Sequence, residues 1–279
     1  MIVKPFPWRH LRMLALALIL GVCALIGSGG VVTASQNPKI LKPEDVVERA
    51  IFAYGSRVAL YTVQKNGILR GLIKFISPTG TSEGKTTTRF IRKPKLTEDL
   101  LMLDLELTGT RFVVGFDGKQ TWTLNNGQVE EPSAETVAAY HGAHAHSYEA
   151  VLRYKENDAK LEYVGNRQFG PAHELDIVDM TLPDGTKTRY EISRRTGRII
   201  YLEYDEKGSE EAKPTKYRLY YKDFRPIQNT LVPYEVQVFK DGKVVEERKL
   251  VEVSYSVQME ESVFNLENAR KPAEAAVKP

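Results

Sequence analysis

Three histidines near the middle of the chain are the residues whose chemistry could be most specific. His141, His144 and His146 stand close together, and imidazole is the commonest metal ligand in proteins. On a helix His141 and His144 would share a face, while His146 would point elsewhere. Zinc needs further ligands and supporting hydrogen bonds, yet the chain has one cysteine and no HExxH pattern. We therefore expect no stoichiometric metal; a metal site is the alternative.

Pairs of carboxylates are the second group that could carry chemistry. Asp104 with Glu106, and Asp176 with Asp179, are close enough in sequence to act together. General acid catalysis needs one carboxyl whose pKa burial has raised, and the pattern indicates only solvent-exposed strand faces. The chain also lacks GxSxG, P-loop and dinucleotide-binding glycine motifs. We predict a protein that is not an enzyme and uses no cofactor.

The beginning of the chain has the pattern of an export signal. A basic segment precedes an uncharged apolar run at 13–26, and small residues at 32–34 suit cleavage before Ser35. We predict that residues 1–34 are a signal peptide and that the mature protein is periplasmic. An uncleaved anchor is an alternative, although the run is short for a bilayer span.

The single cysteine offers a second alternative, a lipid-anchored protein. Cys23 follows Val22, whereas lipidation signals place a small residue before the cysteine. We therefore expect no lipid anchor. After cleavage no cysteine would remain, so no disulfide would stabilise the exported domain.

Cleavage would also remove the basic excess of the chain. The full sequence has 39 Lys and Arg against 36 Asp and Glu. Three of the basic residues and none of the acidic ones lie in 1–34, which leaves 36 of each sign. A nucleic-acid-binding protein keeps a basic excess, so we expect no nucleic-acid partner.

Strands dominate the rest of the sequence. The segment 111–124 reads as strand, turn and strand, with Asp117-Gly118 typical of a type I′ hairpin turn. In 99–108 leucines alternate with mostly polar residues, which predicts a half-buried strand with one solvent-exposed face. We expect about thirteen strands, the first at 58–63 before a turn at Asn66-Gly67.

Two helices interrupt the strand pattern. Pro43 and two acidic residues suit the start of the first helix, and Gly55 suits its end. The second is expected over 134–154, where it carries the three histidines, and Gly142 is a point where it could break.

The order of the elements predicts the fold class. Short connections favour antiparallel pairing, and such a large sheet must curl, fold into a sandwich or be covered. We predict a mainly β protein with two helices, built on a curved antiparallel sheet. Apolar faces on neighbouring strands nominate residues for a cavity, with a sealed core as the alternative. The candidates are Leu101, Leu103, Leu105, Phe112, Val114, Phe116 and Trp122.

Several local patterns together resemble a known family. They are Tyr54-Gly55, Arg92-Lys93-Pro94, Gly115-Phe116-Asp117-Gly118 before Trp122, Arg194 to Ile199, Leu231-Val232-Pro233-Tyr234 and Val263-Phe264. Over about 45–266 the chain resembles the outer-membrane lipoprotein-sorting proteins, the LolA/LolB-like superfamily, in a longer form. The resemblance implies an unclosed half-barrel, here at 35–266, with helices over its concave face. Residues 267–279 lack periodicity and are expected to be a disordered tail.

The resemblance also implies a function. Relatives of this kind carry lipoprotein acyl chains or other lipids through the periplasm in an apolar concavity. We expect a monomeric carrier whose partners are a lipid or an acylated protein and an inner- or outer-membrane delivery protein. A non-catalytic envelope-stress sensor resembling the anti-sigma-factor regulator RseB is the alternative, and an enzyme using the histidines is a third.

Overall fold

The structure is a computed structural model that describes residues 41–206 and 213–270. The chain divides into two compact units, Met1–Lys39 and Ile40–Pro279, and all described residues belong to the second. The expected signal peptide, Cys23 and most of the expected tail lie outside the described residues.

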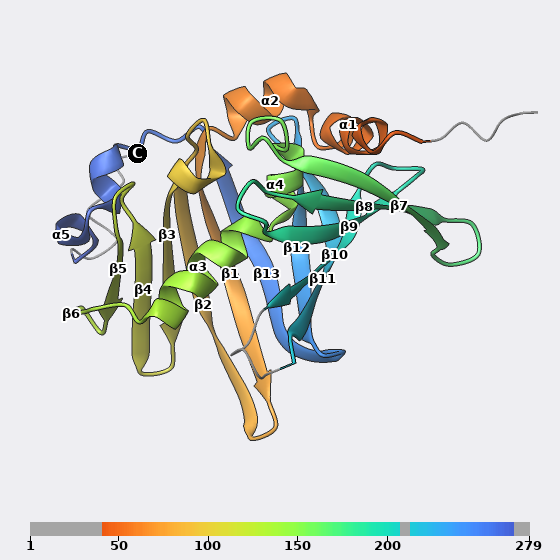
Figure 1. Cartoon of the computed structure of the whole chain (residues 1–279). Helices are drawn as coiled ribbons and strands as arrows, with labels where there is room; N and C mark the ends of the chain where they lie inside the picture. The colour runs from red at the N-terminus through yellow and green to blue at the C-terminus, as the bar shows by residue number, and fades with distance from the viewer. Residues whose placement is uncertain (1–40, 207–212, 271–279) are drawn as a thin grey trace, which may run out of the picture. The chain divides into compact units, whose positions relative to one another are not determined.

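The described residues form one open antiparallel sheet of thirteen strands (Figure 1). From one edge to the other the strands are β6 (Gln128–Glu130), β5 (Thr121–Asn125), β4 (Thr110–Phe116), β3 (Leu100–Leu107), β2 (Gly80–Ile91), β1 (Asn66–Ser77), β13 (Lys243–Tyr255), β12 (Thr230–Lys240), β11 (Thr215–Ile227), β10 (Ile199–Glu206), β9 (Lys187–Ser193), β8 (Glu174–Thr181) and β7 (Lys160–Gln168). The edge strands β6 and β7 do not pair with each other. The predicted fold class, a mainly β protein with an unclosed antiparallel sheet, is confirmed.

Register places the apolar residues of many strands on one face of the sheet. Leu103 lies opposite Thr88 of β2 and Val114 of β4. Further along the sheet, Leu202 of β10 lies opposite Tyr190 of β9 in the same alternation. Because side chains alternate along every strand, these residues define one surface, which we call the inner face.

Helices cover the inner face in two places. The described residues contain the helices α1 (Pro43–Ala53), α2 (Ser56–Val63), α3 (Ala134–Ala145), α4 (Tyr148–Leu152) and α5 (Leu266–Ala269), with 3-10 turns η1 (Leu96–Glu98) and η2 (Glu261–Phe264). Of these, α5 and η2 lie on the opposite face of the sheet. The apolar stripes of α1 and α4 pack into the main core against β8 to β11. In Figure 1, α3 runs across the strands from β4 towards β13.

The prediction of a first strand at 58–63 is wrong. That segment is the helix α2, and Asn66-Gly67 begins β1 instead of forming a hairpin. Gly55 stands between α1 and α2 with a φ of 122°. A Cβ atom at this position would lie 2.6 Å from Asn229 O, so only glycine fits there. A short apolar run cannot by itself distinguish a helix from a strand, and here the burial of Leu60 in the main core decides.

Three other local predictions need correction. The helix expected at 134–154 is two helices, which separate at His146 and Ser147; the Ser147 hydroxyl accepts a hydrogen bond from the Ala150 amide at 3.2 Å and caps α4. The Asp117-Gly118 connection has four residues, and of this pair only Gly118 has positive φ, so it is not a type I′ turn. Helix α5 extends the ordered fold past the expected tail boundary at 267.

The second face of β3 is solvent-exposed only at Glu106, contrary to expectation. Met102 and Asp104 are each 5% exposed, and Met102 packs with Phe264 of η2 and Ala269 of α5 in a second core cluster. Asp104 is compensated by Arg111, which donates hydrogen bonds of 3.0 and 2.7 Å to its two carboxylate oxygens.

Candidate functional site

An apolar groove lies between α3 and the inner face of β1 to β4. Its volume is about 690 Å³, which is within the range of ligand pockets in proteins. Five of the predicted cavity residues line it: Leu101, Leu103, Leu105, Phe112 and Val114. Four of these are only half-buried, so apolar surface remains open inside the fold.

Register brings these five residues together. Leu101, Leu103 and Leu105 alternate along β3, and Phe112 and Val114 lie directly opposite the last two on β4. On the other side β2 contributes Thr86, Thr88 and Phe90 in the same rows. The groove therefore has a regular floor of apolar side chains and threonine methyl groups.

The other two nominated residues lie elsewhere. Phe116 packs edge-on against the ring of His141, with 5.1 Å between ring centroids. Trp122 lies opposite Gly115, on the outer face of the sheet, where its Nε1 donates a hydrogen bond of 2.9 Å to Phe264 O. A methyl group on Gly115 would come within 2.3 Å of that indole ring, so Gly115 makes room for the tryptophan.

Helix α3 covers the groove without sealing it. None of its residues is buried, and the side chains it presents to the groove include Ala139 and Ala143. The helix begins at a capping serine, Ser133, whose hydroxyl accepts from the Thr136 amide at 3.1 Å. Because the side chains of Ala139 and Ala143 are small, they leave space between the helix backbone and the sheet unfilled. This space is part of the groove beneath α3.

Each histidine attaches α3 or its end to a different part of the sheet. His141 Nε2 lies 2.8 Å from Thr121 Oγ1 on β5, and His144 Nε2 lies 3.0 Å from Asp99 Oδ2 before β3. His146 Nδ1 lies 2.7 Å from Thr188 Oγ1 on β9. The three imidazoles do not converge, and residues 41–206 and 213–270 contain no group of three or more His, Cys, Asp or Glu arranged to hold a metal ion.

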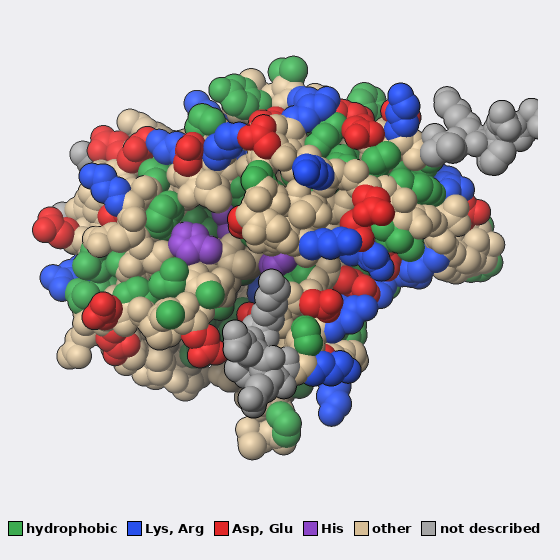
Figure 2. Space-filling view, in the orientation of Figure 1, with side chains coloured by type: hydrophobic (Ala, Val, Ile, Leu, Met, Phe, Trp, Pro, Cys, Tyr) green, Lys and Arg blue, Asp and Glu red, His purple; other side chains and the backbone are tan. Residues whose placement is uncertain are grey.

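Burial weakens the basicity of two of these histidines. It lowers the pKa of His146 to about 4, and the ring is also stacked on Tyr204 with centroids 3.8 Å apart. Burial likewise lowers the pKa of His141, with a smaller contribution from His144. These two side chains therefore hold α3 in their neutral form. Figure 2 shows histidine side chains reaching the surface over the region where α3 runs.

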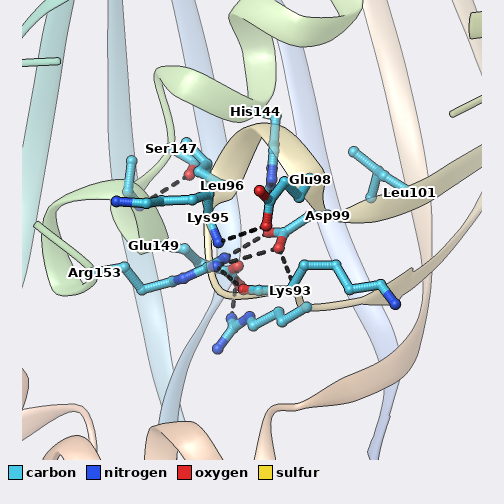
Figure 3. A network of polar contacts seen from close by, with 12 residues as sticks. Lys93, Lys95, Leu96, Glu98, Asp99, Leu101, His144, Ser147, Glu149 and Arg153 are labelled. Carbon is cyan, nitrogen blue, oxygen red and sulfur yellow. Dashed lines mark hydrogen bonds and ion pairs between the residues drawn. The ribbon is translucent and has the colours of Figure 1, made fainter. Parts of the chain in front are cut away.

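A polar network surrounds Asp99, which is among the residues that line the groove (Figure 3). Asp99 accepts hydrogen bonds from the Lys93 amide at 2.7 Å and from Arg153 Nη1 at 2.5 Å, besides its contact with His144. Burial alone would raise the pKa of Asp99, but hydrogen bonds from His144 and Arg153 lower it below its usual value. This carboxylate joins α3, α4 and the start of β3.

A second hollow, of about 980 Å³, lies on the other side of α3. Its lining is largely charged and includes Asp184, Lys187, Glu203 and Lys216. Sequence reasoning missed this hollow because charges occur on both faces of many strands, and alternation then does not distinguish a lining residue from a solvent-exposed one.

Three of the four carboxylates considered for catalysis, Asp104, Asp176 and Asp179, serve in ion pairs. Asp176 contacts Arg49 at 2.5 Å and Arg194 at 2.7 Å, and Asp179 contacts Arg189 at 2.7 Å. The pKa of Asp179 is lowered by hydrogen bonds from Arg189 and Lys187, which outweigh its burial. An acidic carboxylate of this kind is suited to binding cations, not to donating a proton near neutral pH.

In the part of the chain that the structure describes, no helix combines the length and apolar character needed to span a membrane.

The fold resembles those of several solved structures. An outer membrane lipoprotein-sorting protein domain from Vibrio parahaemolyticus superposes with a TM-score of 0.55 at 10% identity, covering 82% of this chain and 100% of its own. A DUF1329 family protein from Desulfovibrio piger gives 0.54 at 11% identity, with 81% and 98% coverage. A LolA superfamily protein from Nitrosomonas europaea gives 0.53 at 10% identity, again with 81% and 98% coverage.

These likenesses establish the fold and confirm the resemblance to LolA-like proteins that the local sequence patterns indicated. No protein-family model matches the sequence, and the sequence has no match among curated proteins.

Proposed function

We propose that this protein is a periplasmic, non-catalytic carrier that holds the acyl chains of lipids or lipoproteins in the groove under α3. The observation that carries the proposal is the row of half-buried leucines, Leu101, Leu103 and Leu105, on a face of the sheet that a helix covers without filling.

The energetics of such a groove favour an acyl chain. Leucine side chains that remain partly exposed lose the benefit of burial, and each methylene of a ligand moved out of water contributes about 0.8 kcal/mol. A chain with about a dozen buried methylenes would therefore gain roughly 10 kcal/mol before its own ordering is counted. It would also cover the leucines.

The location and partners follow from different observations. The apolar run at 13–26 supports export, and the similar structure from Vibrio parahaemolyticus is an outer membrane lipoprotein-sorting protein domain. We propose that this protein works as a monomer that receives a lipid or an acylated protein and passes it to a membrane-bound delivery partner.

A charge placed in the groove tests the proposal. Leu103→Glu puts a carboxylate on the groove floor, and we expect it to weaken binding of a fluorescent fatty acid at least about tenfold, because an unpaired charge in an apolar site is costly. Val251→Glu is the matched control, since Val251 is 64% exposed and lines no hollow described above. Fluorescence titration measures binding, and circular dichroism checks that both variants fold.

Two results would contradict the carrier function. One is a wild-type protein that binds no acyl probe and contains no lipid by native mass spectrometry when purified from the periplasm. The other is a folded Leu103→Glu variant that binds the probe as tightly as the wild type does.

A further inference from the structure

The apolar groove and the charged hollow meet beneath α3. Six residues are common to both linings: Ala139 and Ala143 on α3, His146 at its end, Leu219 on β11, and Glu246 and Arg248 on β13. One ligand could therefore occupy both spaces, with an apolar part on one side of α3 and a polar part on the other.

Arg248 is an unusual residue for its position in the sheet. It lies opposite Ile73 of β1 and Val236 of β12, in a row of otherwise apolar residues on the inner face. Its side chain is nevertheless 48% exposed. Arg248 lines both the apolar groove and the charged hollow beneath α3.

The contacts of Arg248 leave its terminal nitrogens available. Its Nε donates a hydrogen bond to Glu246 Oε1, and within residues 41–206 and 213–270 Glu246 is its only hydrogen-bond or ion-pair partner. Burial opposes the charge, but attraction to Glu246 raises the pKa of Arg248 above its usual value. The group is a cation whose two terminal nitrogens have no partner among the described residues, and their fork is the geometry that matches a carboxylate or a phosphate.

The surroundings set the direction in which a ligand would lie. The lining of the groove also includes Asp99, which pairs with Arg153, and Arg92 and Glu149, which pair with each other at 2.6 Å, so these charges already have partners. The charged hollow beyond Arg248 has side chains of both signs, which can bind the remaining polar groups of a head.

We propose that the groove and the charged hollow form one site for a single acidic amphiphile, whose acyl chain lies on the β1–β4 floor and whose carboxylate or phosphate binds Arg248. This inference rests on the carrier function proposed above and specifies the class of its ligand.

Pairs of ligands that differ only in the acidic group test it. Palmitate is compared with hexadecanol, and palmitoyl lysophosphatidate with monopalmitoylglycerol, each displacing an uncharged fluorescent acyl probe from the wild-type protein. We expect at least one acid to bind about tenfold or more tightly than its uncharged partner, as a charge-assisted bidentate contact implies. The pair that shows the preference identifies the headgroup as a carboxylate or a phosphate.

Two variants and a control assign the preference to Arg248. Arg248→Gln is expected to abolish the preference and to leave hexadecanol binding unchanged. Glu246→Gln, which removes the competing carboxylate, is expected to strengthen binding of the acid. Arg70→Gln is the control, because Arg70 forms a similar pair with Glu252, at 2.8 Å, on the opposite face of β1; it should keep the wild-type preference.

The outcomes separate this inference from the carrier function. Equal binding of acid and uncharged ligand by the wild type, or a preference that survives in Arg248→Gln, would overturn the role of Arg248 while the carrier function stands. If the probe binds but none of the four ligands displaces it, the role of Arg248 is likewise overturned while the carrier function stands. If the probe itself does not bind, the carrier function fails and this inference fails with it.

Discussion

Two regions of the same sheet face are covered by helices and differ in what lies between helix and strands. Under α1 and α4, the side chains of Val46, Val47, Ala150 and Leu202 are all fully buried. Under α3, none of the helix residues is buried, and the floor of β3 and β4 stays half open. Both regions lie on one continuous inner face.

The difference lies in the helices more than in the strands. Helix α1 has 11 residues and α3 has 12, so length does not separate them. The branched side chains of Val46, Val47 and Ile51 on α1 fill the space above the sheet. Helix α3 presents Ala139 and Ala143 to the groove beside larger side chains, and it is attached through histidine hydrogen bonds. A helix held by a few polar contacts can move without breaking a core, and that property suits a cover over a binding groove.

The largest effect is expected from a core truncation that has a matched partner in the groove. Leu202→Ala should lower the free energy of unfolding by about 3–5 kcal/mol, because it leaves a cavity in a sealed core. Leu103→Ala removes the same atoms from a half-buried position and should cost about 1 kcal/mol. Denaturant unfolding monitored by circular dichroism measures both, and equal losses would mean that the two regions are packed alike.

The polar network around Asp99 should come next. Asp99→Asn removes the charge that compensates Arg153, which is 11% exposed, and should destabilise the protein by about 2–3 kcal/mol. Asp223→Asn is the control, since its pair with Arg225 is at the surface, where solvent screens the charges, and it should have little effect on stability. Chemical denaturation measures the free energy of unfolding of both variants. If Asp99→Asn loses no more stability than Asp223→Asn, the network around Asp99 does not help to hold α3 in place.

Acidic pH should weaken the attachment of α3 more modestly. The folded-state pKa of His146 is about 4, below the value of about 6.5 for an unfolded histidine. The unfolded state therefore binds more protons between these values, so stability falls as pH falls from about 6.5 towards 4. Allowing for partial solvent exposure, we expect His146→Asn to reduce the difference between unfolding free energies at pH 7 and pH 5 by about 1–2 kcal/mol.

A control histidine keeps this test specific. His173 contacts Arg195 and lies outside α3, so His173→Asn controls for the loss of a histidine elsewhere in the fold. If the free energy of unfolding of His146→Asn depends on pH as that of the wild type does, the buried His146 imidazole is not the source of the pH dependence.

The smallest effect is expected from strengthening α3 itself. A methyl group added at Gly142 would meet no atom within 4 Å, and alanine is favoured over glycine inside a helix by about 0.5–1 kcal/mol. Gly142→Ala should raise stability by up to that amount and leave acyl-probe binding intact. Thermal unfolding and probe titration check the two expectations; a loss of stability would show that α3 needs the glycine.

Much of the fold was predictable because its signals are local. Alternation along β3 and β4 identified both strands and placed Leu103 and Val114 on one face, since the two-residue period of a strand is independent of what covers it. Antiparallel pairing followed from the short connections. Prediction failed at 58–63, where an apolar run short enough for either structure became a helix through packing against the core.

The sequence by itself determined which residues would share a face, and thereby five of the seven nominated groove residues. Only the tertiary structure decided that this face is a groove, because openness depends on the size of the side chains that a distant helix places above it. Tertiary structure also decided the surroundings of Trp122 and Arg248. Trp122 lies opposite Gly115 on the outer face of the sheet, and Arg248 lines both hollows beneath α3.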